Sequence, residues 1–171
     1  MVLGMSLSTF TMLHVVICLL ALGAGFAVLR DMLRSVDKKG SAIVFLVLSF
    51  LISVTGFLFP FSQLLPGHII GIILLAVLTV ALAAHDLFKL KGIWRPVYVI
   101  AMVAGFYLNA FVTVFQMFLK IGALHDLAPT GSEPPFAAAQ GVLLIAFGVA
   151  GTRAVKNSIR RWHKTLEQPR P

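Results

Sequence analysis

The dominant pattern along the chain is a series of long apolar runs separated by short polar segments. A helix needs about 20 apolar residues to cross the roughly 30 Å of hydrocarbon in a bilayer. Five runs meet this requirement, and they cover residues 8–29, 41–60, 67–87, 96–119 and 136–152. The pattern predicts an all-α membrane protein, a polytopic bundle of five transmembrane helices, whose fifth helix is at the short limit for a span.

The positions of the cationic residues predict the orientation of this bundle. Of the 14 Lys and Arg residues, 13 lie in three groups that follow the first, third and fifth runs: Arg30, Arg34, Lys38 and Lys39; Lys89, Lys91 and Arg95; and Arg153, Lys156, Arg160, Arg161, Lys164 and Arg170. Cytoplasmic segments of membrane proteins carry such an excess of cations. We therefore expect the N-terminus outside and the C-terminus in the cytoplasm, with a transmembrane domain at 1–152 and a basic cytoplasmic tail at 153–171.

Composition supports a membrane protein and argues against a nucleic-acid-binding protein. The chain is 59% hydrophobic and 12% charged, and its mean hydropathy of +0.98 lies outside the range of soluble domains. Its net charge of +8 would suggest nucleic-acid binding in a soluble protein, but here the cations flank apolar runs. The expected partner is the lipid bilayer, with no role for nucleic acid. A single cysteine, Cys18, excludes an intramolecular disulfide.

The fourth run contains a row of polar residues within the stretch NAFVTVFQMFLK. At about 100° per residue, Asn109, Thr113, Gln116 and Lys120 fall within about 60° of one another on one helix face. Burying an amide in hydrocarbon without a hydrogen-bond partner costs on the order of several kcal/mol. This face must therefore be turned towards the protein or a water-filled cavity. Two interpretations are open. The row can hold helices together, with Lys120 extending to the interface, or it can line a ligand site.

Other polar residues are expected in the same outer half of the bundle, and they favour a site. These pocket candidates are His14 in the first run, His68 at the start of the third and Glu133 in the loop before the fifth. A small polar or anionic solute would meet the charge of Lys120, with Asn109, Gln116 and His14 as orienting donors, unless Glu133 pairs with Lys120 instead. The favoured function is a solute or ion transporter, a channel or a sensor subunit. Five helices form a thin wall around a pore, so a homo-oligomer is plausible.

Redox and metal sites are weaker alternatives. Haem b needs two histidines on different helices at matching depth, which His14 and His68 could supply, and a quinone could bind there too. His68 and His85 lie about 26 Å apart along one helix, so these two cannot share a haem. A metal set of His68, His125, Asp126 and Glu133 lacks a recognisable ligand spacing. No particular cofactor follows from the sequence.

Catalysis is not favoured either. The chain has no G-x-S-x-G, Walker or dinucleotide-binding motif, and its scattered histidines and carboxylates do not form a recognisable catalytic set. A further alternative is a structural or assembly subunit of a larger membrane complex. Small residues four positions apart, as in Ala101 with Gly105, would let its helices approach closely.

Three segments resemble a family of small multi-pass bacterial inner-membrane proteins that carry a domain of unknown function. The resemblance is strongest in NAFVTVFQMFLKIGALHDLAPTGSEPPF, residues 109–136, and extends to LHVVICLLALGAGFAVL and KGSAIVFLVLSFLISVTGFLFPF nearer the start. It implies a location in the bacterial inner (plasma) membrane. It implies no substrate and no catalytic role for any residue.

Overall fold

The computed structural model describes residues 2–36, 39–60 and 66–167, which are almost entirely helical. The helices are α1 (Leu7–Leu33), α2 (Lys39–Phe57), α3 (Pro66–Leu82), a π-helical turn η1 (Ala83–Leu87), α4 (Trp94–Lys120), a short α5 (Gly122–His125) and α6 (Pro134–Glu167). Within these residues five helices are long and apolar enough to cross a membrane. The predicted all-α, five-span architecture is confirmed, and the protein is an integral, multi-pass membrane protein.

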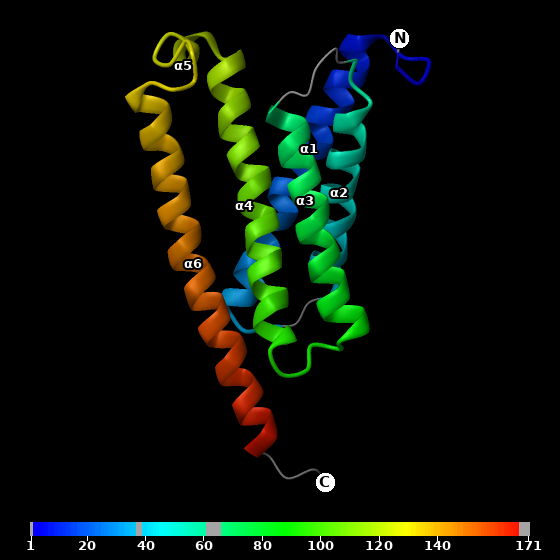
Figure 1. The fold of residues 1–171 in the computed structure, drawn as a ribbon, viewed down its shortest axis with the longest axis vertical. Coiled ribbons are helices and arrows are strands. Elements are labelled where there is room, and N and C mark those ends of the chain that lie inside the picture. Colours follow the sequence, from blue (N-terminus) through cyan, green and yellow to red (C-terminus); the bar gives the residue numbers. More distant parts are fainter. Residues whose placement is uncertain (1, 37–38, 61–65, 168–171) are drawn as a thin grey trace.

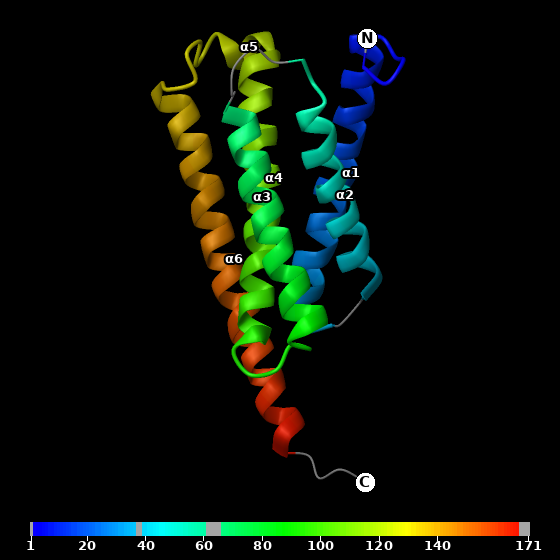
Figure 2. The same ribbon diagram turned by 45° about the vertical axis from the view of Figure 1, so that its right-hand side comes forward.

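The long helices alternate in direction between two ends of an elongated bundle (Figure 1). The N-terminus, α5 and the start of α3 lie at one end, named here the N-terminal end. The end of α1, the start of α2, the α3–α4 connection and the end of α6 lie at the other, named the basic end because the described residues of the three cationic groups are located there. In Figure 2, α1 and α2 are neighbours on one side, α6 is on the opposite side, and α3 and α4 lie between them.

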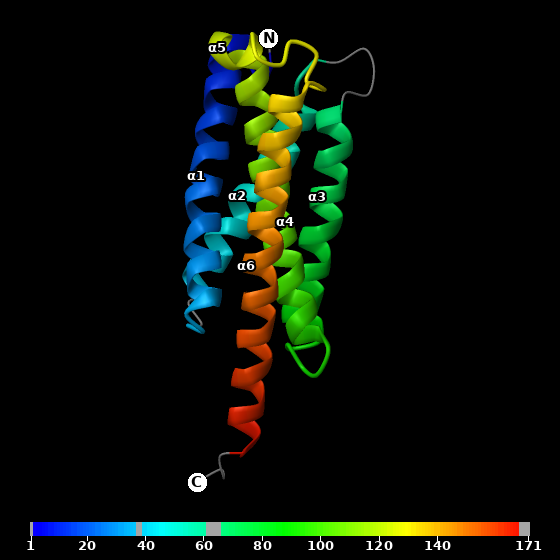
Figure 3. The same ribbon diagram turned by 90° about the vertical axis from the view of Figure 1, so that its left-hand side faces the viewer.

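The ends of the helices follow local chemistry. Ser6 caps α1 by accepting a hydrogen bond from the Thr9 amide at 3.2 Å. The sixth helix is longer than the predicted fifth run, because the basic residues after 152 are good helix formers and no proline follows until Pro169. It passes through 152–153 without a break and extends beyond α1 and α3 at the basic end (Figure 3).

The fourth helix is the centre of the bundle, and Phe106 is the centre of its packing. This side chain is 1% exposed. Its ring lies 5.0 Å from that of Phe26 on α1, 6.2 Å from that of Phe45 on α2 and 4.9 Å from that of Phe147 on α6. Three other helices therefore bury aromatic surface against one position of α4.

Glycine makes the crossing of α1 and α4 possible. A Cβ atom at Gly25 would lie 2.2 Å from Cδ2 of Phe106, far inside van der Waals contact. At Gly105, one of the small residues expected to pack closely, a Cβ would lie 3.6 Å from Leu74 and 3.7 Å from Phe45. The α1–α4 crossing thus depends on the missing side chain at Gly25.

The basic end of the bundle is tied together by side chains of α6. The Asn157 amide donates to the Leu33 carbonyl at 2.8 Å, and the Arg161 guanidinium donates to the Ser35 carbonyl at 2.6 Å. These carbonyls lie at the end of α1, where helix carbonyls lose their internal partners. The guanidinium of Arg95 on α4 lies 5.5 Å from the Trp162 ring centroid of α6. Both α1 and α4 are therefore held against α6 at this end.

Candidate functional site

The polar row of α4 divides into a buried part and an exposed part. Asn109 is 6% exposed, and its side-chain amide donates to the Ser49 hydroxyl of α2 at 2.8 Å. Thr113 is half-buried, and its hydroxyl donates to the Asn109 carbonyl of its own helix at 2.8 Å. Asn109 is therefore an interhelical contact, the role expected from one of the two interpretations of this row.

Gln116 and Lys120 are exposed near the N-terminal end. Within the described part of the chain, no carboxylate lies within ion-pair distance of the Lys120 ammonium. Thr113 and Lys120 follow Phe106 by seven and fourteen residues, so helix geometry places them within about 40° of the face of α4 that Phe106 occupies. Phe106 meets α1, α2 and α6, and the row continues from its level towards the end of the bundle, where Lys120 is exposed.

Glu133 does not pair with Lys120. Its carboxylate accepts hydrogen bonds from the Thr130 amide at 3.0 Å, the Thr130 hydroxyl at 2.8 Å and the Ser132 amide at 3.0 Å. Desolvation is the largest single influence and raises the pKa of Glu133, but the hydrogen bonds from Thr130, Ser132 and the Glu133 amide together outweigh it and lower the pKa from 4.5 to about 2. Pro134 and Pro135, the first two residues of α6, have no amide hydrogen that Glu133 could accept. Glu133 therefore stabilises the loop before the helix and does not cap its first turn.

His14 is an interhelical contact between α1 and α2. Its Nδ1 lies 2.7 Å from the Thr55 hydroxyl, which also lies 2.6 Å from the Leu51 carbonyl of its own helix. The ring tautomer decides whether Nδ1 or the hydroxyl donates in the His14–Thr55 hydrogen bond. The ring also meets Phe59 edge-on at 5.3 Å.

The second histidine of the proposed haem pair lies on another side of α2. His68 is 7% exposed, and its ring stacks on Phe57 at 5.9 Å. Thr55 and Phe57 are two residues apart on one helix, which directs their side chains about 200° apart. Because His14 contacts α2 beside Thr55 and His68 contacts it at Phe57, α2 lies between the two rings. The structure does not bring them together, and nothing in this arrangement favours a bis-histidine haem.

The described residues contain no group of three His, Cys, Asp or Glu side chains that could hold a metal ion. Of the four residues considered as ligands, His68 is stacked in the bundle and Glu133 is engaged by its own loop. His125 and Asp126 are exposed on and just after α5.

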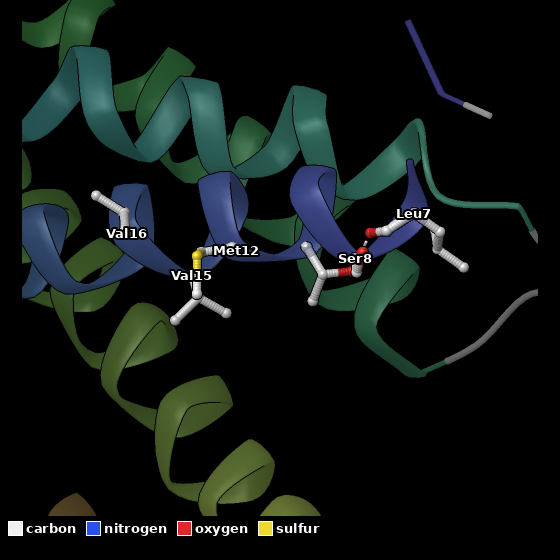
Figure 4. Close-up of a pocket in the computed structure, with 6 residues that line it drawn as sticks. Leu7, Ser8, Met12, Val15 and Val16 are labelled. Atoms are coloured by element: carbon white, nitrogen blue, oxygen red, sulfur yellow. Dashed lines mark hydrogen bonds between the residues drawn. The ribbon is translucent and has the colours of Figure 1, made fainter. Parts of the chain in front are cut away.

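A groove is open along α1 at the N-terminal end. It has a volume of about 680 Å³ and is lined by Leu7, Ser8, Thr11, Met12, Val15 and Val16. Met12 and Val15 project from α1 on the side away from α2 (Figure 4). The Thr11 hydroxyl donates to the Leu7 carbonyl at 2.8 Å, so the polar groups of this wall are satisfied locally and the wall is mainly apolar. The sequence predicted a polar pocket, whereas the hollow found here is an open groove with an apolar wall.

At the end of the bundle where this groove lies, α1 and α4 separate. They touch at Gly25 and Phe106, and from there towards the N-terminal end they diverge (Figures 1 and 2). We call the region between their diverging halves the wedge. The groove on its α1 side is lined by α1 residues, and α4, on the other side, carries Thr113, Gln116 and Lys120 in its diverging half.

Sequence reasoning missed the partners of the polar residues and the apolar wall of the wedge. Ser49 and Ser53 lie four residues apart and are both buried on one face of α2, a pattern that could have identified a contact face. No such signal was available for Met12, Val15 and Val16. An apolar residue that lines an open groove has the same sequence pattern as one that faces lipid.

Comparisons with protein-family models, with curated proteins and with solved structures found no match to this chain. The assignment as a membrane protein therefore rests on the five apolar helices, and the wedge is the structural feature that bears on function.

Proposed function

We propose that this protein is a bacterial inner-membrane transporter or sensor subunit that admits an amphipathic anion into the wedge from the outer leaflet. The observation that carries the proposal is the apolar groove on α1 at the end where α1 and α4 diverge, together with the exposed Lys120 on α4. The bacterial location rests on the sequence resemblance, and the outward orientation rests on the three cationic groups at the basic end.

The chemistry of the two walls supports an amphipathic anion over a small hydrophilic solute. Met12, Val15 and Val16 offer apolar surface that a hydrocarbon body can cover. Lys120 is the single Lys or Arg outside the three cationic groups. It stands near the level of the lipid headgroups, where an anionic head entering from the bilayer would meet it together with the Gln116 amide.

The packing of the basic half supports a transporter or sensor over an open channel. A cluster of buried apolar side chains fills this part of the bundle: Val28, Phe45, Leu74, Leu78, Ala81, Ala101, Met102 and Phe106. A continuous aqueous path along the axis would have to pass through these residues.

The proposal is tested by measuring how a dansyl-labelled undecanoic acid and its uncharged methyl ester bind to the protein in nanodiscs. Val15→Trp fills the α1 groove, and we expect it to weaken binding of both probes about tenfold, or about 1.4 kcal/mol. Lys120→Gln should weaken binding of the acid about fivefold and leave the ester unchanged, because the ester lacks the charge that meets the ammonium.

Val54→Trp is the matched control. The His14–Thr55 hydrogen bond places Val15 on α1 and Val54 on α2 at the same depth, and both are exposed, at 48% and 37%. Val54 is on a different helix and does not line the groove. If the Val54 variant weakens binding as much as the Val15 variant, or if Lys120→Gln affects acid and ester equally, the wedge is not the binding site.

A further inference from the structure

A second groove lies between α3 and α4 in the basic half of the bundle. Its volume is about 320 Å³, and it is lined by Ala76, Val77, Val80, Val97, Ile100, Ala101 and Ala104. All of these side chains are small or β-branched and apolar. From Val97 to Ala104 the groove follows α4 for about 10 Å. A helix with its side chains is about 10–12 Å across and would occupy on the order of 1,000 Å³ over this length, so a groove of about 320 Å³ suits a hydrocarbon chain instead.

The connection between α3 and α4 places cations at the open end of this groove. Lys89 and Lys91 are exposed in the turn, whose backbone has φ values of 51° at Lys89 and 52° at Gly92. Arg95 follows in the first turn of α4, but its guanidinium lies over the Trp162 ring of α6. Asp86 is the nearby carboxylate and contacts Nδ1 of His85 at 2.6 Å; among the described residues it forms no ion pair with either lysine, and the two lysines outnumber it.

An aromatic pair fixes the depth of these cations in the membrane. Trp94 stacks on Phe88 with ring centroids 3.6 Å apart, at the junction of the turn and α4. Tryptophan is enriched at the membrane–water interface. The turn therefore lies at the level of lipid phosphates, and the α3–α4 groove lies directly beyond it at the level of the acyl chains.

We infer that the α3–α4 groove binds one anionic phospholipid of the leaflet at the basic end. One acyl chain lies along Ala76 and Val80 on α3 and Ile100 on α4, and the phosphate is held by Lys89 and Lys91. Both parts of the ligand have a counterpart on the protein: the apolar groove between α3 and α4, and the two exposed lysines in the turn that joins these helices. Basic pockets between transmembrane helices on the cytoplasmic side recognise anionic headgroups by this chemistry. The inference does not depend on the wedge, which lies at the other end of the bundle.

Native mass spectrometry of the protein released from micelles with equal amounts of phosphatidylglycerol and phosphatidylcholine tests this site. We expect the wild-type protein to retain more phosphatidylglycerol than phosphatidylcholine. Lys89→Gln with Lys91→Gln should lower that preference about fivefold to tenfold, because two cations near the phosphate are lost. Ala76→Phe places a ring in the groove and should reduce retention of both lipids.

Matched changes on α6 separate a specific site from general attraction to charge and apolar surface. Arg153→Gln with Lys156→Gln removes two exposed cations from the same end, and Ala146→Phe adds the same ring to an exposed alanine outside the groove. Both should retain lipid as the wild type does. Equal losses in the α6 variants would overturn the inference, as would unchanged retention in Ala76→Phe. Release of the lipid by added inorganic phosphate would identify a phosphate site instead and would also overturn it.

Discussion

The crossing of α1 and α4 provides the most direct test of how this bundle is held together. A Cβ added at Gly25 would lie 2.2 Å from Cδ2, 2.6 Å from Cε2 and 2.7 Å from Cγ of Phe106. Carbon atoms in contact are normally about 3.5–4.0 Å apart, so the helix or the ring would have to move by more than about 1 Å. Phe106 cannot make room easily, because aromatic rings from three other helices surround it.

Gly25→Ala is therefore expected to destabilise the protein. Adding a methyl group to a well-packed core typically costs about 1–3 kcal/mol, and the short distances place this site at the upper end, about 3 kcal/mol. Alanine regains about 0.5–1 kcal/mol of helix propensity relative to glycine. The expected net loss in the free energy of unfolding is about 2 kcal/mol.

The measurement is the free energy of unfolding in mixed micelles, titrated with SDS and followed by far-UV circular dichroism. Gly23→Ala is the control: it lies on the same helix, and a Cβ there meets nothing within 4 Å, so its effect should be neutral or slightly stabilising. In a Phe106→Leu background the cost of Gly25→Ala should shrink, because the ring it meets is gone. The reasoning is wrong if Gly25→Ala and Gly23→Ala differ by less than about 0.5 kcal/mol.

Two further predictions concern polar contacts elsewhere in the bundle. Ser49→Ala removes the acceptor of the buried Asn109 amide and should lower the free energy of unfolding, measured by SDS titration, by about 1 kcal/mol. Ser53→Ala should lower it less, because the Ser53 hydroxyl donates only within α2, at 3.2 Å. Equal effects of the two changes would contradict the interhelical role of Ser49. The depressed pKa of Glu133 means that its ionised form stabilises the loop above about pH 4.5 and that this stabilisation is lost as the pH falls towards 2. The free energy of unfolding of Glu133→Gln should therefore fall less than that of the wild type between these pH values. If both proteins show the same pH dependence, Glu133 is not its source.

The candidate site was only partly predictable, and Asn109 and Lys120 show why. Their shared helix face follows from a fixed angle per residue, so it could be read from the sequence. Their different environments could not. Asn109 lies near the level where α4 still touches its neighbours and finds Ser49, whereas Lys120 lies beyond the point at which α1 and α4 have diverged. Whether a polar residue joins helices or lines an opening depends on the distance between helices at its depth.

The sequence by itself determined the number of spans, their approximate limits and the end of the bundle that carries the cations. These properties are local, because an apolar run of membrane length and a flanking cation each act without a partner. The tertiary structure alone decided that His14 and His68 contact different sides of α2, that Glu133 serves its own loop, and that a wedge opens between α1 and α4. The wedge depends on the missing side chain of Gly25, which sets the crossing against Phe106, and on the α6 contacts that hold the basic end together, both of which join residues far apart in the chain.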